Sequence, residues 1–308
     1  MPDALYFSDV ALGPKPTQVE WAEVSGGKRI RLVCWKGGKK GTVFIFQGRT
    51  EYVEKYGAVA EQFLNLGYSV VTCDWRGQGL SDRYPRHYQI GEVDAFSDYQ
   101  IDVEAMMDFA RRQKTPKPYF ALGHSLGGGI LLRSLHNGLD VKGAMFSAPM
   151  WGILLPFYLK PFTALITSLY QSFGWMDALA PGRNTDNYVE VQPFKGNVLT
   201  NDTEEYMVMR KQIMAHRELG LAGPSMNWAN LAIQETLDLQ SLSAPSHPAL
   251  TLYAGDEKIV DNGAIEAIVA GWSSNKGVKI AGAEHEVLME TPERRAQCWS
   301  EIEAFLNA

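Results

Sequence analysis

Short runs of consecutive apolar residues alternate along the chain with segments whose apolar residues recur at helical spacing. Continuous apolar runs are typical of strands buried on both faces of a sheet, and we predict such strands at 42–46, 68–73, 119–122 and 143–147. The helical spacing predicts helices at 56–66, 99–112 and 127–136. Strands that alternate with helices in this way indicate βαβ units and a parallel sheet.

The chain begins with a different pattern. Residues 18–24 and 30–35 are predicted to pair as a β-hairpin, because Gly26 and Gly27 between them supply the positive φ that tight turns need.

The α/β pattern stops near residue 150 and returns a hundred residues later. Strands are predicted again at 249–254 and 278–280, and an amphipathic helix at 292–306 closes the chain. The intervening segment is rich in aromatic residues, Leu, Met and Pro and carries no clear strand pattern. We predict one α/β core, residues 1–150 and 241–308, interrupted by a helical cap insertion, residues 151–240.

Composition narrows the class of protein. Of 308 residues, 45% are hydrophobic and 21% charged, which is typical of a soluble globular chain. The net charge is −6 and no basic cluster is present, so nucleic acid is not an expected partner. Three widely spaced cysteines and a start without a secretory pattern favour a cytoplasmic protein. The longest apolar stretch, 150–170, is broken by two prolines and a lysine and does not predict a membrane span.

The sequence GHSLG at 123–127 matches the G-x-S-x-G nucleophile elbow, in which a serine stands on a sharp turn between a strand and a helix. The bare pattern is weak, since it arises by chance in about one chain in ten at this length. Here a predicted strand precedes it and a predicted helix follows it. We therefore predict Ser125 as a nucleophile.

A nucleophilic serine needs a base and an acid, which follow it in this fold in the order serine, acid, histidine. Asp256 and Glu257 come directly after the strand predicted at 249–254, and His285 follows the next strand. Both loops are expected at the carboxyl edge of the sheet, where open α/β sheets place their sites. The order predicts His285 as the base and either Asp256 or Glu257 as the acid.

The oxyanion of the tetrahedral intermediate needs two N–H donors. We predict the backbone amide of Leu126, which follows the nucleophile, and that of Arg49, in the loop after the strand at 42–46. His124 is expected to shape the elbow. No H-E-x-x-H motif or Cys/His cluster is present, so we expect neither a metal nor another cofactor.

In these motifs the chain resembles the α/β-hydrolases of the monoacylglycerol lipase and lysophospholipase L2 group. This group is also called serine aminopeptidase-like or hydrolase 4. The resemblance covers nearly the whole chain and rests on five segments: FIFQGRTEYVEKY, CDWRGQGLSDR, GHSLGGG, GDEKIVD and AGAEHEVLME. The group places its acid three residues before a valine, which here implies Glu257 before Val260, with Asp256 as the alternative. Its usual His-Gly oxyanion loop is Gln47-Gly48 here, which resembles the bacterial lysophospholipase branch.

The resemblance implies a serine hydrolase of lipid esters, with a lysophospholipid or monoacylglycerol as substrate. The alternatives are a short-chain carboxylesterase and, in another class, a catalytically silent binding protein, against which the intact triad argues. Haloalkane dehalogenase chemistry is excluded, because it needs Asp at the position of Ser125.

The start of the cap is either a helix packed on the core or a lid, and the two readings are compatible. A lid would line an acyl tunnel with the apolar residues Ile153, Leu154, Leu155 and Phe157. Its outer face would make transient contact with a membrane surface, leaving a cytoplasmic protein peripheral to the membrane. The sequence does not indicate an oligomeric state.

Overall fold

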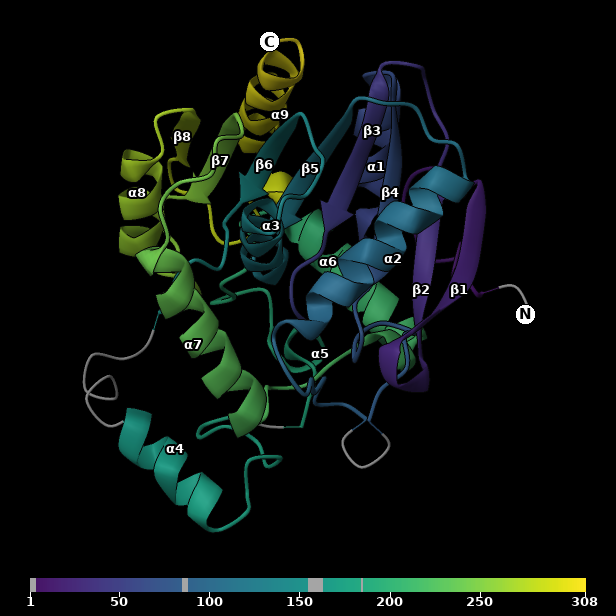
Figure 1. The fold of residues 1–308 in the computed structure, drawn as a ribbon. Coiled ribbons are helices and arrows are strands. Elements are labelled where there is room, and N and C mark those ends of the chain that lie inside the picture. The colour runs from purple at the N-terminus through teal and green to yellow at the C-terminus, as the bar shows by residue number, and fades with distance from the viewer. Residues whose placement is uncertain (1–3, 85–87, 155–162, 184) are drawn as a thin grey trace.

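A computed structural model describes residues 4–84, 88–154, 163–183 and 185–308. Its strands are β1 (Gln18–Val24), β2 (Lys28–Trp35), β3 (Gly41–Phe46), β4 (Tyr68–Asp74), β5 (Tyr119–His124), β6 (Gly143–Ser147), β7 (Ala249–Ala254) and β8 (Asn275–Ile280). They form one eight-stranded sheet in the order β1-β2-β4-β3-β5-β6-β7-β8 (Figure 1). The pairs β1–β2 and β2–β4 are antiparallel, and all the other neighbours are parallel. The predicted, mostly parallel α/β sheet is confirmed.

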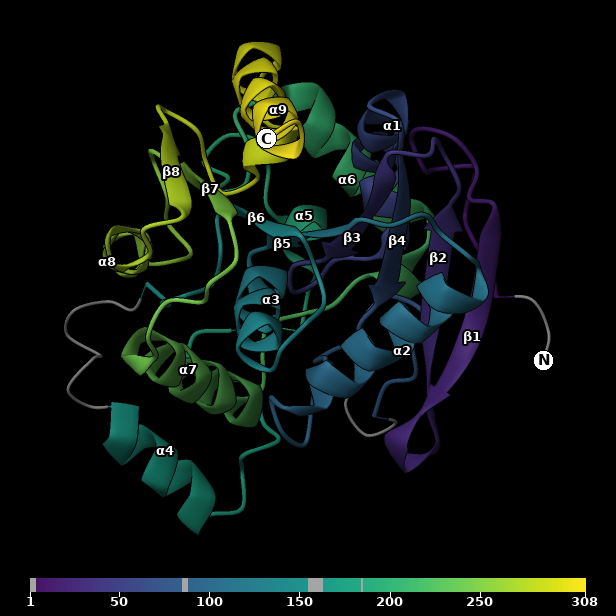
Figure 2. The same cartoon turned by 45° about the horizontal axis from the view of Figure 1, so that its top comes forward.

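Helices cover both faces of this sheet. The core helices are α1 (Gly57–Asn65), α2 (Asp98–Arg112), α3 (Leu126–His136), α8 (Asn262–Gly271) and α9 (Pro292–Leu306). In Figure 2, α1 and α9 lie on one side of the sheet, and α2 and α3 lie on the other. The carboxyl ends of the parallel strands thus meet at one edge between two helical layers.

Each central strand contributes to two hydrophobic cores. In β3, Val43 and Ile45 belong to the core beneath α1 and α9, whereas Phe44 and Phe46 belong to the core beneath α2 and α3. Successive side chains of a strand point to opposite faces, so a strand covered on both sides is predominantly apolar on both faces. This is the physical reason for the continuous apolar runs in the sequence.

The segment predicted as a cap contains α4 (Thr163–Ser172), α5 (Tyr188–Val191), α6 (Thr203–Ala215) and α7 (Met226–Ser241). Helix α7 is tied to α3, since Arg133 pairs with Glu235 at 2.7 Å. Helix α6 is tied to the core by the Tyr52 hydroxyl, which donates to Gln212 at 2.9 Å. In both ribbon views α4 stands at the edge of the molecule, separated from the sheet by α7 (Figures 1 and 2).

No helix among the described residues is both long and apolar enough to cross a membrane.

Candidate active site

Ser125 stands on the sharp turn between β5 and α3. Its backbone has φ 48° and ψ −118°, a conformation that costs a residue with a side chain about 1–3 kcal/mol. A Cβ at Gly127 would lie 1.9 Å from the carbonyl oxygen of Phe46, and one at Gly123 would lie 2.7 Å from that of Gly127. Glycine is therefore required where strand, turn and helix approach one another.

Neighbouring backbone groups fix this turn. The Ser125 N–H donates to the carbonyl of Ser147 at 3.0 Å, and the Ser125 carbonyl accepts from Met150 at 2.8 Å. Leu126 is the first residue of α3, so its N–H has no acceptor within the helix. The amide predicted as one oxyanion donor therefore stands directly beside the predicted nucleophile.

Glu257 and His285 come from the loops after β7 and β8 and meet as a buried pair. His285 Nδ1 lies 2.8 Å from Glu257 Oε2, and the side chains of His285 and Glu257 are 5% and 1% exposed. The other Glu257 oxygen accepts backbone N–H groups, from Ile259 at 2.8 Å among others. Burial raises the pKa of Glu257, but His285 and these amides outweigh it and leave the pKa below its usual value. The carboxylate is thus held ionised against one imidazole nitrogen.

Asp256, the alternative acid, lies next to Glu257 but is exposed. Its backbone N–H donates to the carbonyl of Ala283 at 2.9 Å, which fixes the loop. Among the described residues the carboxylate that contacts His285 Nδ1 is that of Glu257.

Gly48 and Arg49 follow β3 and lie close to the elbow. A Cβ at Gly48 would come within 3.1 Å of the ring of His124, the residue before Ser125. Strand pairing agrees with this position, because Phe46 at the end of β3 is paired with Gly123 at the end of β5. The structure therefore brings the predicted oxyanion loop to the same edge of the sheet as Ser125.

The Arg49 side chain turns toward the cap. Its guanidinium donates to the carbonyls of Ile90, at 2.5 Å, and Ala222, at 3.0 Å, and lies over the ring of Trp228. Burial lowers the pKa of Arg49 to about 10. This side chain ties the cap to the loop in which the predicted oxyanion donor lies.

A buried cluster of four ionisable side chains lies beside the elbow and the histidine loop. Lys55 Nζ donates to Glu286 at 2.6 Å and also to Glu51, and His124 Nε2 lies 3.3 Å from Glu286. Burial lowers the pKa of His124, but the two carboxylates outweigh it and raise the pKa above its usual value. The ring centroids of His124 and His285 are 5.0 Å apart. The cluster thus joins the elbow, the oxyanion loop and the histidine loop.

Three members of this cluster have the geometry of a cation site, since Glu51, His124 and Glu286 present ligand atoms within 4.8 Å of one another. Lys55 already contacts both carboxylates. Its ammonium supplies the positive charge that a bound cation would bring.

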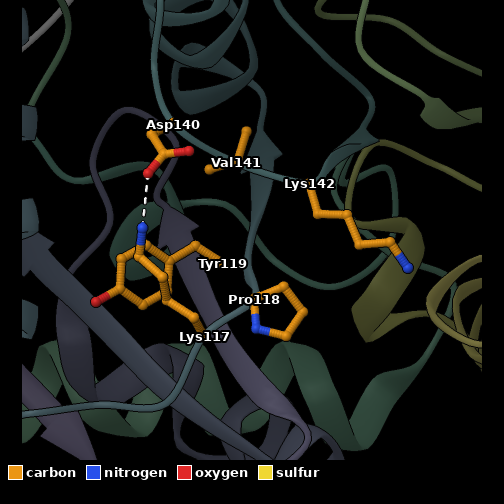
Figure 3. Close-up of a pocket in the computed structure, with 6 residues that line it drawn as sticks. All are labelled: Lys117, Pro118, Tyr119, Asp140, Val141 and Lys142. Carbon is orange, nitrogen blue, oxygen red and sulfur yellow. Dashed lines mark hydrogen bonds and ion pairs between the residues drawn. The ribbon is translucent and has the colours of Figure 1, made fainter.

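A separate hollow lies at the amino ends of the parallel strands, opposite the ends that hold the candidate site (Figure 3). It is lined by residues just before or at the start of β5 and β6, including Pro118, Tyr119 and Lys142. The Lys117 ammonium points to Asp140 at 2.8 Å across it. Because Ser125 follows the other end of β5, this hollow is not part of the candidate site.

The sheet order, the helices on both faces and the position of the elbow define an α/β-hydrolase. Residues 37–292 match the family described as "Serine aminopeptidase, S33", and the chain belongs to this family, within its lysophospholipase L2-like and monoglyceride lipase-like part. The family resemblance predicted from the motifs is confirmed, and it places the chain among lipases and esterases.

Individual relatives agree with this placement. The chain is 30% identical to "Lysophospholipase L2" of Escherichia coli K12 over 86% of this chain and 80% of that one. It is 27% identical to "Probable lysophospholipase L2" of Haemophilus influenzae over 98% and 97% of the two chains. A soluble variant of monoglyceride lipase from Saccharomyces cerevisiae shares the fold, with a TM-score of 0.74, 20% identity and coverage of 99% and 98%.

The sequence prediction missed the contacts around the site. Glu51 and Lys55 are four residues apart after β3, but Glu286 lies more than 200 residues further along the chain and meets them because β3 and β8 end on the same side of the sheet. The local signals were the spacing of four residues between Glu51 and Lys55 and the position of Glu286 directly after His285.

Proposed function

We propose that this protein hydrolyses carboxylic esters of lipids through an acyl-enzyme on Ser125, with His285 as base and Glu257 as the orienting acid. The observation that carries the proposal is the buried contact of 2.8 Å between His285 Nδ1 and Glu257, at the sheet edge that also holds the strained Ser125 elbow.

The proposed chemistry follows from which imidazole nitrogen of His285 is bound to Glu257. Glu257 accepts from Nδ1–H, so Nε2 remains to take the proton of the Ser125 hydroxyl as its oxygen attacks the ester carbonyl. The N–H groups of Leu126 and Arg49 stabilise the oxyanion of the tetrahedral intermediate. The imidazolium then protonates the leaving alcohol, and a water activated in the same way releases the acid. No step calls for a cofactor.

For the substrate, we propose a lysophospholipid or a monoacylglycerol. The relatives named as lysophospholipases support the first, and the fold neighbour named as a monoglyceride lipase supports the second. Both substrates carry one long acyl chain next to a polar group, and the cap is proposed to bind that chain. Of the four residues predicted to line a tunnel, Leu155 and Phe157 lie outside the described residues. Ile153 forms a β-bridge with Val260 in the acid loop, and Leu154 is exposed.

The cap also presents an apolar outer surface, which we propose contacts lipid transiently. It comprises four exposed side chains on and after α4: Leu165, Leu169, Phe173 and Trp175. Phe173 and Trp175 stack on each other, with ring centroids 4.8 Å apart. Large apolar side chains gathered in one exposed place are typical of a surface that meets lipid or another protein.

The proposed nucleophile is tested by Ser125→Ala together with a fluorophosphonate probe. The variant should fold with an unchanged Tm and lose esterase turnover, because only the hydroxyl is removed. The probe should add one covalent label to the wild type, and peptide mass spectrometry should place it on Ser125. Labelling of another residue, or an active Ser125→Ala variant, would refute the proposal.

A further inference from the structure

Several backbone polar groups of the oxyanion loop, residues 47–50, have hydrogen-bond partners. The Gln47 carbonyl accepts from the Trp75 indole at 2.9 Å, and the Gly48 N–H donates to the carboxylate of Glu51. The Thr50 N–H donates to Gln78 Oε1 at 2.7 Å. Among the described residues, the Arg49 N–H has no acceptor within hydrogen-bonding distance. Arg49 is half-buried, and its unpaired amide is a donor that the loop can offer to a ligand.

One side chain holds the peptide units on both sides of Arg49. The Gly48 carbonyl and the Arg49 N–H belong to a single planar peptide unit and point in opposite directions. Gln78 Nε2 donates to that carbonyl, with a long distance of 3.4 Å, while Gln78 Oε1 accepts from the Thr50 N–H in the next unit. The amide of Gln78 therefore fixes the direction in which the Arg49 N–H points.

Gln78 is itself rigidly placed. It is 2% exposed and lies between Gly77 and Gly79, both of which have positive φ. A Cβ at Gly79 would come within 2.2 Å of the Asp74 carboxylate, so the loop wraps closely around that group. Asp74 pairs in turn with the fully buried Arg31 at 2.6 Å. The loop after β4 is thus a firm support for the loop after β3.

The backbone of Thr50, which contacts Gln78, has a conformation that threonine disfavours. It has φ 68°, and for a β-branched residue a positive φ is a genuine outlier. Such a conformation persists only where the surroundings impose it. In this conformation the Thr50 N–H donates to Gln78.

We propose that Gln78 is a positioning residue that aims the Arg49 N–H at the oxyanion and holds Thr50 in its strained conformation. The proposal rests on the proposed function, because it takes Ser125 as the nucleophile and Arg49 as a donor. It assigns a role in catalysis to the loop after β4, which contributes none of the proposed catalytic groups.

Gln78→Met tests the proposal, because methionine has a similar length and shape but neither donates nor accepts as the amide does. Removing an oxyanion donor outright costs about 100- to 1,000-fold in kcat, so a misdirected donor should cost roughly 10- to 100-fold. KM should change little, because the oxyanion forms only in the transition state. The affinity for a trifluoromethyl ketone, which forms a tetrahedral adduct with the serine, should fall by the same factor as kcat/KM.

A second substitution tests the role of Thr50. Glycine adopts φ 68° without strain, so Thr50→Gly added to Gln78→Met should restore part of the lost kcat. Gln100→Met is the matched control, because Gln100 on α2 also uses both ends of its amide. It donates to Ile130 and accepts from Ser134 and Asn137, far from the oxyanion loop in sequence. It should lower Tm and leave kcat/KM unchanged.

The outcomes separate this inference from the proposed function. If the wild type hydrolyses esters and is labelled at Ser125, but Gln78→Met retains kcat/KM and ketone affinity, Gln78 has no positioning role. The same conclusion follows if Gln78→Met merely lowers Tm as Gln100→Met does. If the wild type neither hydrolyses esters nor forms the adduct at Ser125, the proposed function itself fails.

Discussion

Two adjacent carboxylates, Asp256 and Glu257, have very different surroundings. Glu257 is almost completely buried and is held by His285 and by backbone amides, whereas Asp256 is exposed. The motif order alone leaves both as candidates, and the spacing to Val260 and the longer side chain favour Glu257. The two carboxylates differ in burial because neighbouring side chains on a loop point in different directions.

Glu257→Gln should therefore reduce kcat by about 1,000- to 10,000-fold, since the imidazolium loses its carboxylate and the correct tautomer is no longer enforced. Asp256→Asn is the matched control and should change kcat less than threefold. Steady-state hydrolysis of a p-nitrophenyl ester measures both effects. If Asp256→Asn shows the larger loss, Asp256 is the acid and the contact seen at Glu257 is not the catalytic one.

How far the sequence predicts a residue depends on whether its partners are local. Ser125 could be predicted because its glycines lie two residues away, and His285 because it follows a strand in the expected order. Gln78 could not be predicted, since its partners Gly48 and Thr50 lie about thirty residues away along the chain. Its contacts depend on how the loops after β3 and β4 pack together.

At the level of elements, the buried central strands could be predicted from the sequence, whereas the edge strand β8 could be predicted only in part. Strand β8 begins at Asn275, three residues before the predicted start, because it is an edge strand with exposed positions and lacks a continuous apolar run. Helix α8 was not predicted, and Ile265 is its only fully buried residue. A helix that buries so little leaves a weak periodic signal in the sequence.

The division into core and cap remains a prediction, although the elements within it are now visible. The cap helices do not form one uniform layer. Helix α7 is tied to α3 by an ion pair, α6 reaches the core near Tyr52, and α4 stands apart from the sheet. Four exposed large apolar side chains lie on α4 and directly after it, so the proposed lipid contact belongs to this segment.

Substituting Leu169 and Phe173 by serine should weaken binding to phosphatidylcholine vesicles by at least tenfold, since burial of each such side chain contributes about 1.5–3 kcal/mol. The exposed Met214 on α6 provides the control, and Met214→Ser should leave binding unchanged. Sedimentation with vesicles measures the affinity. Equal binding by both variants would mean that α4 does not meet the lipid.

At the level of the whole molecule, the net charge of the protein and the arrangement of its loops constrain how the proposed lipid substrate reaches Ser125. The net charge of −6 opposes attraction to anionic membranes, so any contact with lipid must rest on apolar surface. The fold brings four loops to one edge of the sheet: those after β3, β5, β7 and β8, which carry Arg49, Ser125, Glu257 and His285. The loop after β4 supports them from the side through Gln78.

The central claim is that this edge hydrolyses esters with long acyl chains. It is tested most directly by kcat/KM for p-nitrophenyl esters of increasing chain length, measured beside lysophosphatidylcholine and monoolein. Each methylene moved from water into an apolar site contributes about 0.8 kcal/mol, which corresponds to roughly a fourfold gain. The account predicts a steep rise with chain length until the acyl site is full, and turnover of at least one of the two lipids. A flat or falling profile, with only short esters hydrolysed, would contradict it and identify a short-chain carboxylesterase instead.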